Sequence, residues 1–195
     1  MNTSPTQDTN QGLAESTSIA LKKIFKGQTI KKVLLVSPPD VNAALFDYTT
    51  TKRGRSNNYP PYGLGVVARH LLSNGIDTRI CNLNHEVLKK CMQSADASLF
   101  DFEKTWKTKL AQEVKELQPD LIGVTCLFTV THLSLIDVCR EIKNLKPQWL
   151  KPRTQIPLAA GGVHITHDID RILTDIPGVD FIFPHEAELS FLHFI

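Results

Sequence analysis

Side chains capable of chemistry gather in the second half of the chain, where short apolar runs end. His164 and His167 form the run His-Ile-Thr-His, which is separated from the glycine pair Gly161-Gly162 by Val163. Histidine is a common metal ligand, but this spacing lacks the ordered pattern of a zinc enzyme, so we interpret both as loop histidines. Cys126 closes an apolar run and is predicted to be a buried, inert thiol. No catalytic residue and no metal ligand is predicted.

Several well-known ligand motifs are absent from the sequence. There is no GxxxxGK[ST] phosphate loop and no Gly-x-Ser-x-Gly elbow. Gly63-Leu64-Gly65 lacks the third glycine of a dinucleotide fingerprint. The basic stretch Lys52 to Arg55 is more typical of a solvated loop than of a phosphate clamp. These absences argue against nucleotide-binding and hydrolase classes.

Composition and charge narrow the class further. Of 195 residues, 42% are hydrophobic, and 22 Lys and Arg against 20 Asp and Glu give a net charge of +2. That balance predicts neither a nucleic-acid binder nor a membrane-surface protein. No apolar run approaches the ~20 residues that span a bilayer. The four cysteines form no CxxC pair, which favours a reduced, cytoplasmic, soluble domain.

The chain divides into a tail and one domain. Residues 1–30 are rich in Asn, Thr, Ser and Gln, so we expect a disordered or weakly ordered tail. They lack the features of a signal peptide. Ile19 to Phe25 could form a short amphipathic turn on the domain. Residues 31–195 are predicted to form a single α/β domain.

Within that domain, short apolar runs alternate with amphipathic stretches. Five buried strands are expected, at Lys32–Ser37, Ile76–Asn84, Asp120–Cys126, Ile156–Gly162 and Val179–Phe183. Helices are expected between them and after the last, including Leu133–Leu145, Ile169–Ile176 (capped by Pro177-Gly178) and Glu186–Ile195. Strict alternation predicts a doubly wound, mostly parallel five-stranded sheet with the flavodoxin-like (Rossmann-like) order 2-1-3-4-5. Ligands of such folds bind beyond the carboxyl ends of the strands.

Five sequence runs, taken in order, resemble the cobalamin-binding domain that precedes the catalytic core of many radical S-adenosylmethionine enzymes: LLVSPP, YPPYGLGVVARHLLSNG, PDLIGVTCLFT, LAAGGVHIT and VDFIFPHEAE. The resemblance extends from Lys32 to about Phe194. It implies a corrin ring on the carboxyl edge of the sheet and a nucleotide tail that enters between strands. Thr125, Phe128 and Thr129 would then lie beside the ring.

The resemblance implies further contacts with this cofactor. Gly161, Gly162 and His164 would flank the tail, because glycines let the backbone approach a ligand closely. The remaining implied contacts come from other loops at the same edge: Pro38, Pro39, Cys126, His185 and Glu186.

The sequence departs from the family pattern in three places. The cobalt-ligating DxHxxG motif is absent around Pro39 to Asn42, which implies cobalamin without a protein histidine below the metal; His132 or His164 is the competing ligand. His185 to Glu188 reads His-Glu-Ala-Glu where the family has Gly-Glu-Gly-Glu. No CxxxCxxC motif is present, so no iron–sulfur cluster is expected in this chain.

The favoured function is therefore a cobalamin-binding module. It would hold a corrinoid for methyl transfer or related radical chemistry, with a radical S-adenosylmethionine catalytic domain on another chain as its partner. The alternative is a ligand-free doubly wound domain that acts through protein–protein contacts. An independent small-molecule enzyme is less favoured, because no nucleophile or acid–base pair is evident.

Overall fold

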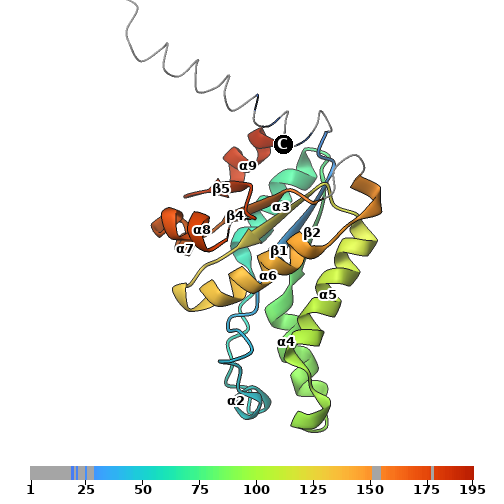
Figure 1. The fold of residues 1–195 in the computed structure, drawn as a ribbon, viewed down its shortest axis with the longest axis vertical. Coiled ribbons are helices and arrows are strands. Elements are labelled where there is room, and N and C mark those ends of the chain that lie inside the picture. Colours follow the sequence, from blue (N-terminus) through green and yellow to red (C-terminus); the bar gives the residue numbers. More distant parts are fainter. Residues whose placement is uncertain (1–18, 20, 22–24, 26–28, 151–154, 177) are drawn as a thin grey trace, which may run out of the picture.

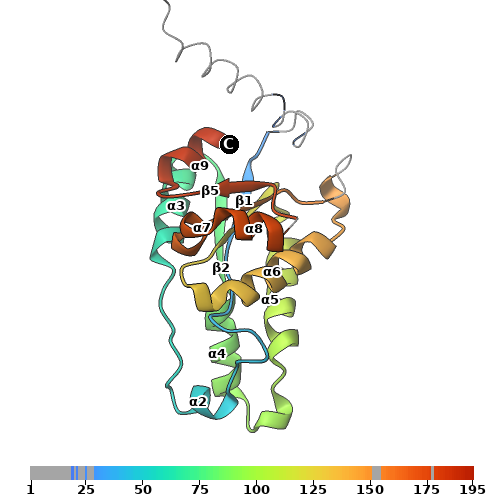
Figure 2. The same cartoon turned by 60° about the vertical axis from the view of Figure 1, so that its left-hand side comes forward.

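The protein is a five-stranded parallel sheet covered by helices on both faces (Figures 1 and 2). The computed structural model describes residues 19, 21, 25, 29–150, 155–176 and 178–195. The strands are β1 (Lys32–Ser37), β2 (Asp77–Asn82), β3 (Leu121–Thr125), β4 (Leu158–Gly161) and β5 (Phe181–Phe183). Their order is β2-β1-β3-β4-β5 and every pair is parallel. The predicted fold class is confirmed.

Helices separate into two groups by the face of the sheet that they cover. One face carries α3 (Tyr62–Ser73) and α9 (Glu188–Phe194). The other carries α4 (Leu83–Gln93), α5 (Phe102–Leu117), α6 (His132–Asn144) and α8 (Ile169–Asp175). The short helix α7 (Val163–His167) follows β4. Right-handed crossovers between parallel strands produce this arrangement.

Strand alternation divides the core between the two faces. In β1, Leu34 and Val36 pack with α5 and α6, whereas Val33 and Leu35 pack with α3. All four side chains are buried, as expected for a central strand whose two faces are both covered.

Two aspartates fix the amino ends of neighbouring strands. The Asp120 carboxylate, just before β3, accepts hydrogen bonds from the backbone N–H groups of Lys31 and Lys32 at 2.9 and 3.0 Å. Asp180, just before β5, accepts from the N–H of Leu158 at 2.8 Å and pairs with Lys143 at 2.6 Å. These bonds satisfy backbone donors at the edge opposite the carboxyl ends of the strands.

Most strand and helix ends differ from the sequence-based expectation by one or two residues. The second strand ends at Asn82, because the Asn82 side chain caps α4 by accepting from the His85 N–H at 2.9 Å. The fifth strand contains only Phe181–Phe183. The loop expected after β1 contains a short helix, α2 (Tyr48–Lys52). The Lys52 ammonium donates to two carbonyls at the end of α4, at 2.8 and 2.9 Å, so part of the basic stretch is structural.

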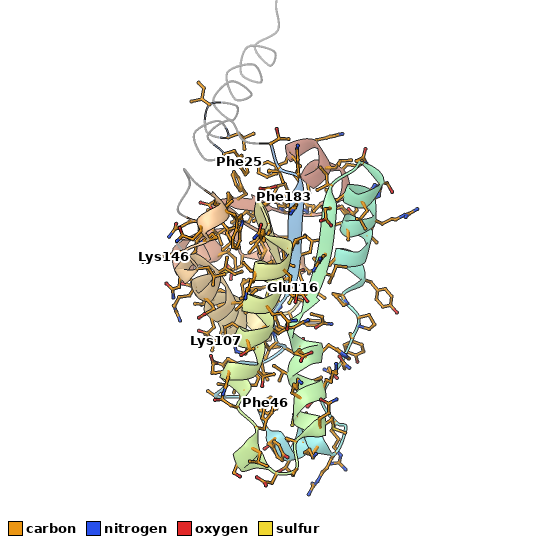
Figure 3. All side chains as sticks on the ribbon, turned by 90° about the vertical axis from the view of Figure 1, so that its right-hand side faces the viewer. Phe25, Phe46, Lys107, Glu116, Lys146 and Phe183 are labelled. Atoms are coloured by element: carbon orange, nitrogen blue, oxygen red, sulfur yellow. The ribbon has the colours of Figure 1, made fainter. Side chains whose placement is uncertain are left out.

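Phe25 packs on the domain, although it lies in the segment expected to be a tail. It is 7% exposed, and its ring stacks on Phe181 at 5.5 Å and meets Phe194 edge-on at 5.7 Å. Figure 3 shows it at the end of the sheet, above Phe183. Most of residues 1–30, and Pro177 of the expected cap, lie outside the described residues. The division into tail and domain stays a prediction.

Candidate functional site

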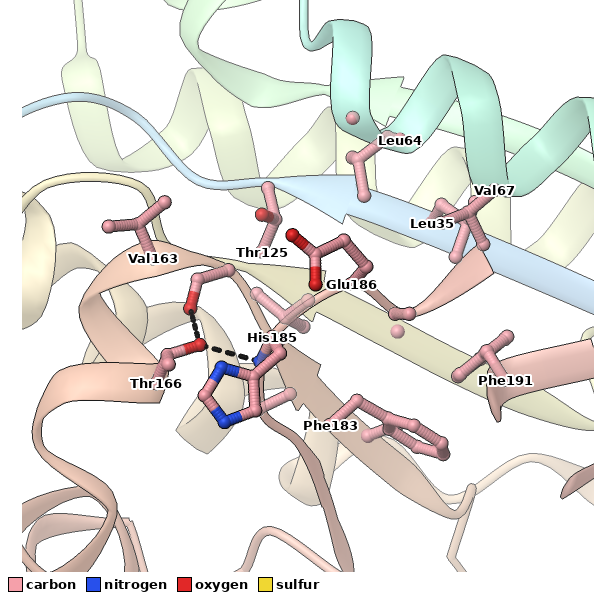
Figure 4. Close-up of a pocket in the computed structure, with 18 of the residues that line it drawn as sticks. Leu35, Leu64, Val67, Thr125, Val163, Thr166, Phe183, His185, Glu186 and Phe191 are labelled. Carbon is pink, nitrogen blue, oxygen red and sulfur yellow. Dashed lines mark hydrogen bonds between the residues drawn. The ribbon is translucent and has the colours of Figure 1, made fainter. Parts of the chain in front are cut away.

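A cavity of about 550 Å³ opens at the carboxyl edge of the sheet, on the face covered by α3 and α9 (Figure 4). Leu64 and Val67 of α3 form one wall, and Phe183 and Phe191 form the opposite one. Helix α7 and the loop after β5 complete the rim. The volume lies in the range of small-molecule and cofactor sites.

The floor of this cavity consists of small residues on two paired strands. Gly123 of β3 is in register with Ala159 of β4, and Thr125 is in register with Gly161. A Cβ on Gly123 would lie 3.0 Å from Leu35 Cδ2. Three of these four positions carry no side chain or only a methyl group, so Thr125 has the largest side chain among them.

Gly162 has a structural role beside the cavity. Its φ is +115°, and a Cβ there would lie 2.5 Å from the carbonyl oxygen of Cys126. That same oxygen accepts a hydrogen bond from the His164 N–H at 3.1 Å. Glycine is therefore required for the chain to cross the end of β3 and enter α7.

The loop after β5 contributes both polar and apolar groups to the cavity. His185 adopts a left-handed conformation, with φ of +62°, and its N–H donates to the Thr166 hydroxyl at 2.8 Å. The Glu186 side chain points across the cavity toward Thr125 (Figure 4). Side chains at 185 and 187 thus line the cavity without closing it.

An exposed apolar patch adjoins the cavity. Four of its residues come after β3 in the sequence, and the fifth is the first residue of α7. Each side chain is between 45% and 60% exposed: Leu127, Phe128, Val130, Leu133 and Val163. A patch of large apolar groups next to a cavity is typical of a ligand or partner surface.

Two buried histidines lie behind the patch. His132 Nδ1 lies 3.0 Å from His164 Nε2, His132 Nε2 lies 2.7 Å from an Asp175 carboxylate oxygen, and His164 Nδ1 lies 3.3 Å from the Thr129 hydroxyl. Every ring nitrogen of the pair has a partner. Burial, followed by the neighbouring His132, lowers the pKa of His164, and the hydrogen bond from His132 lowers the pKa of Asp175.

The predicted site residues fall into three groups. Thr125, Gly161, Gly162, His185 and Glu186 line the cavity. Phe128 and Thr129 are exposed on the adjoining loop. The others are buried outside the cavity: Pro38, Pro39, Cys126 and His164. The Cys126 thiol lies 2.9 Å from the Thr131 hydroxyl, and burial raises its pKa, so it stays protonated at neutral pH.

Sequence reasoning missed the α3 wall and half of the floor. Gly63, Leu64, Val67, Gly123 and Ala159 all line the cavity. The run Gly-Val-Thr in β3 and the run Ala-Ala-Gly in β4 place small residues at alternate positions, and that alternation was the available signal.

The B12-binding domain model matches residues 54–195. The chain belongs to the B12-binding domain family. Among solved structures, the radical S-adenosylmethionine methyltransferase TsrM from Kitasatospora setae, with cobalamin and a [4Fe-4S] cluster bound, is similar at 19% identity and a TM-score of 0.50. The structure of the same enzyme with tryptophan and a SAM analogue bound has 19% sequence identity and a TM-score of 0.49. That match covers 75% of this chain and 22% of the TsrM chain. No curated protein matches.

The likeness to TsrM shows the fold alone. The match covers 76% of this chain and 23% of the TsrM chain, so this chain spans about a quarter of that enzyme.

The site of this B12-binding domain fits a corrinoid in chemistry and shape. A floor of glycine, alanine and threonine and an apolar patch at the mouth of the cavity suit a large, flat, partly apolar cofactor with a protruding tail. In the described part of the chain, no three His, Cys, Asp or Glu side chains are grouped to hold a metal ion. In the same part, no helix is long and apolar enough to cross a membrane.

Proposed function

We propose that this B12-binding domain holds a cobalamin, with the nucleotide tail in the cavity and the corrin ring against the apolar patch. The single observation that carries this proposal is the small-residue floor of β3 and β4. Four adjacent positions on one face lack large side chains, whereas on the other face β3 carries Ile122 and Val124 and β4 carries Leu158. An open cavity of this volume with a few polar groups at its rim is typical of a ligand site.

Polar groups at the rim support the same occupant. A corrin ring carries amide side chains, and the Thr125 hydroxyl and the Glu186 carboxylate can accept hydrogen bonds from amide N–H groups. Phe128 offers an exposed aromatic face on the neighbouring loop. When bound, cobalamin supplies the cobalt-centred chemistry of methyl transfer, and the protein supplies orientation and access.

We further propose that no protein histidine binds the cobalt from below. His132 and His164 are buried, and their ring nitrogens are occupied by each other, by Asp175 and by Thr129. Coordination by either one would break that hydrogen-bonded chain. This supports a site without a histidine ligand.

The catalytic partner is proposed to be a radical S-adenosylmethionine domain outside this sequence. Support comes from the resemblance of the five sequence runs to the cobalamin-binding domain that precedes the core of radical S-adenosylmethionine enzymes. The ligand-free alternative, in which the domain acts through protein contacts, is the other outcome of the binding experiment.

The binding experiment is a titration with hydroxocobalamin, followed by visible spectroscopy. We expect saturable binding by the parent and about tenfold or greater weakening in Gly161→Val, because the valine would fill the cavity. A Cβ at Gly161 meets only Phe183 atoms at 3.4 and 3.8 Å, so the variant should fold. Gly65→Val is the matched control, since Gly65 has open space and lies outside this cavity. Absence of binding by the folded parent would favour the ligand-free alternative.

The lower ligand is tested by electron paramagnetic resonance of the cobalt(II) form. A coordinated nitrogen splits each cobalt line into three, and we expect no such splitting. Splitting that disappears in His132→Ala or His164→Ala would identify a histidine ligand and contradict this part of the proposal.

A further inference from the structure

The two buried histidines belong to a continuous hydrogen-bonded chain that crosses the domain edge. It runs from Asp175 on α8, through His132 on α6 and His164 on α7, to the Thr129 hydroxyl beside the exposed patch. Both rings are nearly inaccessible, at 3% and 4% exposure. Thr129 at one end and Asp175 at the other are exposed.

Hydrogen-bond chemistry fixes the direction of this chain when both rings are neutral. The Asp175 carboxylate only accepts, so His132 must carry its proton on Nε2. His132 Nδ1 is then an acceptor, and His164 must donate from Nε2. His164 Nδ1 is left as an acceptor, so the Thr129 hydroxyl donates inward, toward the protein.

One added proton reverses the direction of the hydrogen bond between His164 and Thr129. The proton enters at His164 Nδ1, and the proton on His164 Nε2 passes to His132 Nδ1. His132 becomes a cation beside the Asp175 carboxylate, and His164 is neutral again with its proton on Nδ1. That N–H now donates to the Thr129 oxygen, so the hydroxyl hydrogen is free to point outward.

We propose that His132 and His164 form a proton relay that sets whether the Thr129 hydroxyl donates into the protein or toward a ligand on the carboxyl edge. The two histidines and Asp175 are positioning residues, and Thr129 is the group that meets the ligand. The consequence for cobalamin binding rests on the proposed function, whereas the relay itself does not.

Charges of both signs face the histidine pair. Asp175 and Asp168 favour a cation, and Arg171, which lies 3.2 Å from Asp175 and 3.8 Å from Asp168, opposes one. The Cys126 thiol, on the residue that follows β3, is uncharged because burial raises its pKa. Burial and His132 lower the pKa of His164, so the His164 ring should be uncharged above neutrality, and we expect proton uptake only in more acidic solution.

Nitrogen-15 NMR of the histidine rings tests the relay in the cofactor-free protein. Above neutrality we expect both rings as Nε2–H tautomers. On acidification we expect His132 to become doubly protonated while His164 changes to the Nδ1–H tautomer, with one shared midpoint. Asp175→Asn should move that midpoint down by about one pH unit, and Asp170→Asn, on the same helix without a contact to either ring, should not. An Nδ1–H tautomer at His132 above neutrality, or two independent titrations unchanged by Asp175→Asn, would overturn the relay.

The link to the site is tested by the affinity for hydroxocobalamin across pH 5 to 8. At each pH, the affinity of the parent is divided by that of Thr129→Val. Because both proteins bind the same corrinoid, any titration of the corrinoid itself cancels in this ratio. We expect this ratio to rise about two- to tenfold on proton uptake, the worth of one hydrogen bond, and Thr129→Ser to keep the parent profile. A flat ratio with the NMR result intact would show that Thr129 does not meet the ligand. A parent that binds no hydroxocobalamin would contradict the proposed function, and the NMR result would still decide the relay.

Discussion

Gly162 lies against the backbone of Cys126 so closely that a Cβ at position 162 would lie 2.5 Å from the Cys126 carbonyl oxygen. The two residues follow adjacent strands, and the contact holds the end of β4 against the end of β3. The glycine pair expected to border a cofactor tail therefore contains two different roles. Gly161 leaves space in the cavity, and Gly162 allows the chain to turn beside it.

Gly162→Ala should destabilise the protein by about 2 kcal/mol or more. The substitution combines a backbone region that is almost exclusive to glycine with a clash against backbone that cannot move aside. Urea unfolding followed by circular dichroism measures the loss. Gly63→Ala is the control: it lies in a helix with open space around it, so it should be neutral or stabilise by up to about 1 kcal/mol. Equal stability of Gly162→Ala and the parent would contradict the assigned turn.

His185→Val should cost about 1–2 kcal/mol, while His185→Asn should be nearly neutral. Position 185 has φ of +62°, a conformation that asparagine tolerates and β-branched residues resist. The same unfolding experiment distinguishes the two. A valine variant as stable as the asparagine variant would mean that the loop after β5 adopts another conformation.

The stability of the protein should fall as the pH drops from 7 toward 5. The pKa of His164 is lowered by burial and by His132, so the unfolded chain binds more protons than the native one once the pH falls below about 6.5. The lowered pKa of Asp175 acts in the same direction at lower pH, and its contribution is lost as the pH falls through its native value. Urea midpoints measured across this range in the parent and in His164→Gln test the assignment. The variant should show a flatter profile between pH 7 and 5, and an equally steep one would exclude His164 as the source.

Phe25→Ala should lower the free energy of unfolding by about 2–4 kcal/mol, because it removes a ring that is 7% exposed and stacked on Phe181. Removal of residues 1–18 should have little effect, and removal of residues 1–28 should cost as much as Phe25→Ala. Thermal unfolding of the three variants measures this. Unchanged stability of the longer truncation would support the expectation of a dispensable tail.

The sheet was predictable because each strand has a local sequence signal, a short apolar run. Val33 to Val36 form an apolar run too short for a helix, and similar runs recur at regular intervals with helical patterns between them. The ends of the strands and helices were harder to predict. The end of β2 depends on whether the Asn82 side chain continues the strand or caps the next helix, and a cap is a matter of side-chain geometry that no periodicity encodes.

The site was predictable where residue type alone limits the backbone, as at Gly161 and Gly162. Gly123 and Ala159 were missed because their importance arises from register, which places two small residues side by side across strands 36 positions apart. The partnership of His132 with His164 is likewise tertiary. Their rings meet only because α6 and α7 follow neighbouring strands.

The cavity beside α9 affects the motions of the domain. Helix α9 packs on β5 through Phe191 and Phe194, and part of the space beside the Phe191 ring is cavity rather than packed side chain. Amide groups in α9 should therefore exchange with deuterium faster than those of α5, whose inward face is packed along its whole length. A ligand that fills the cavity would replace the missing contacts, and slower exchange in α9 would then report occupancy directly.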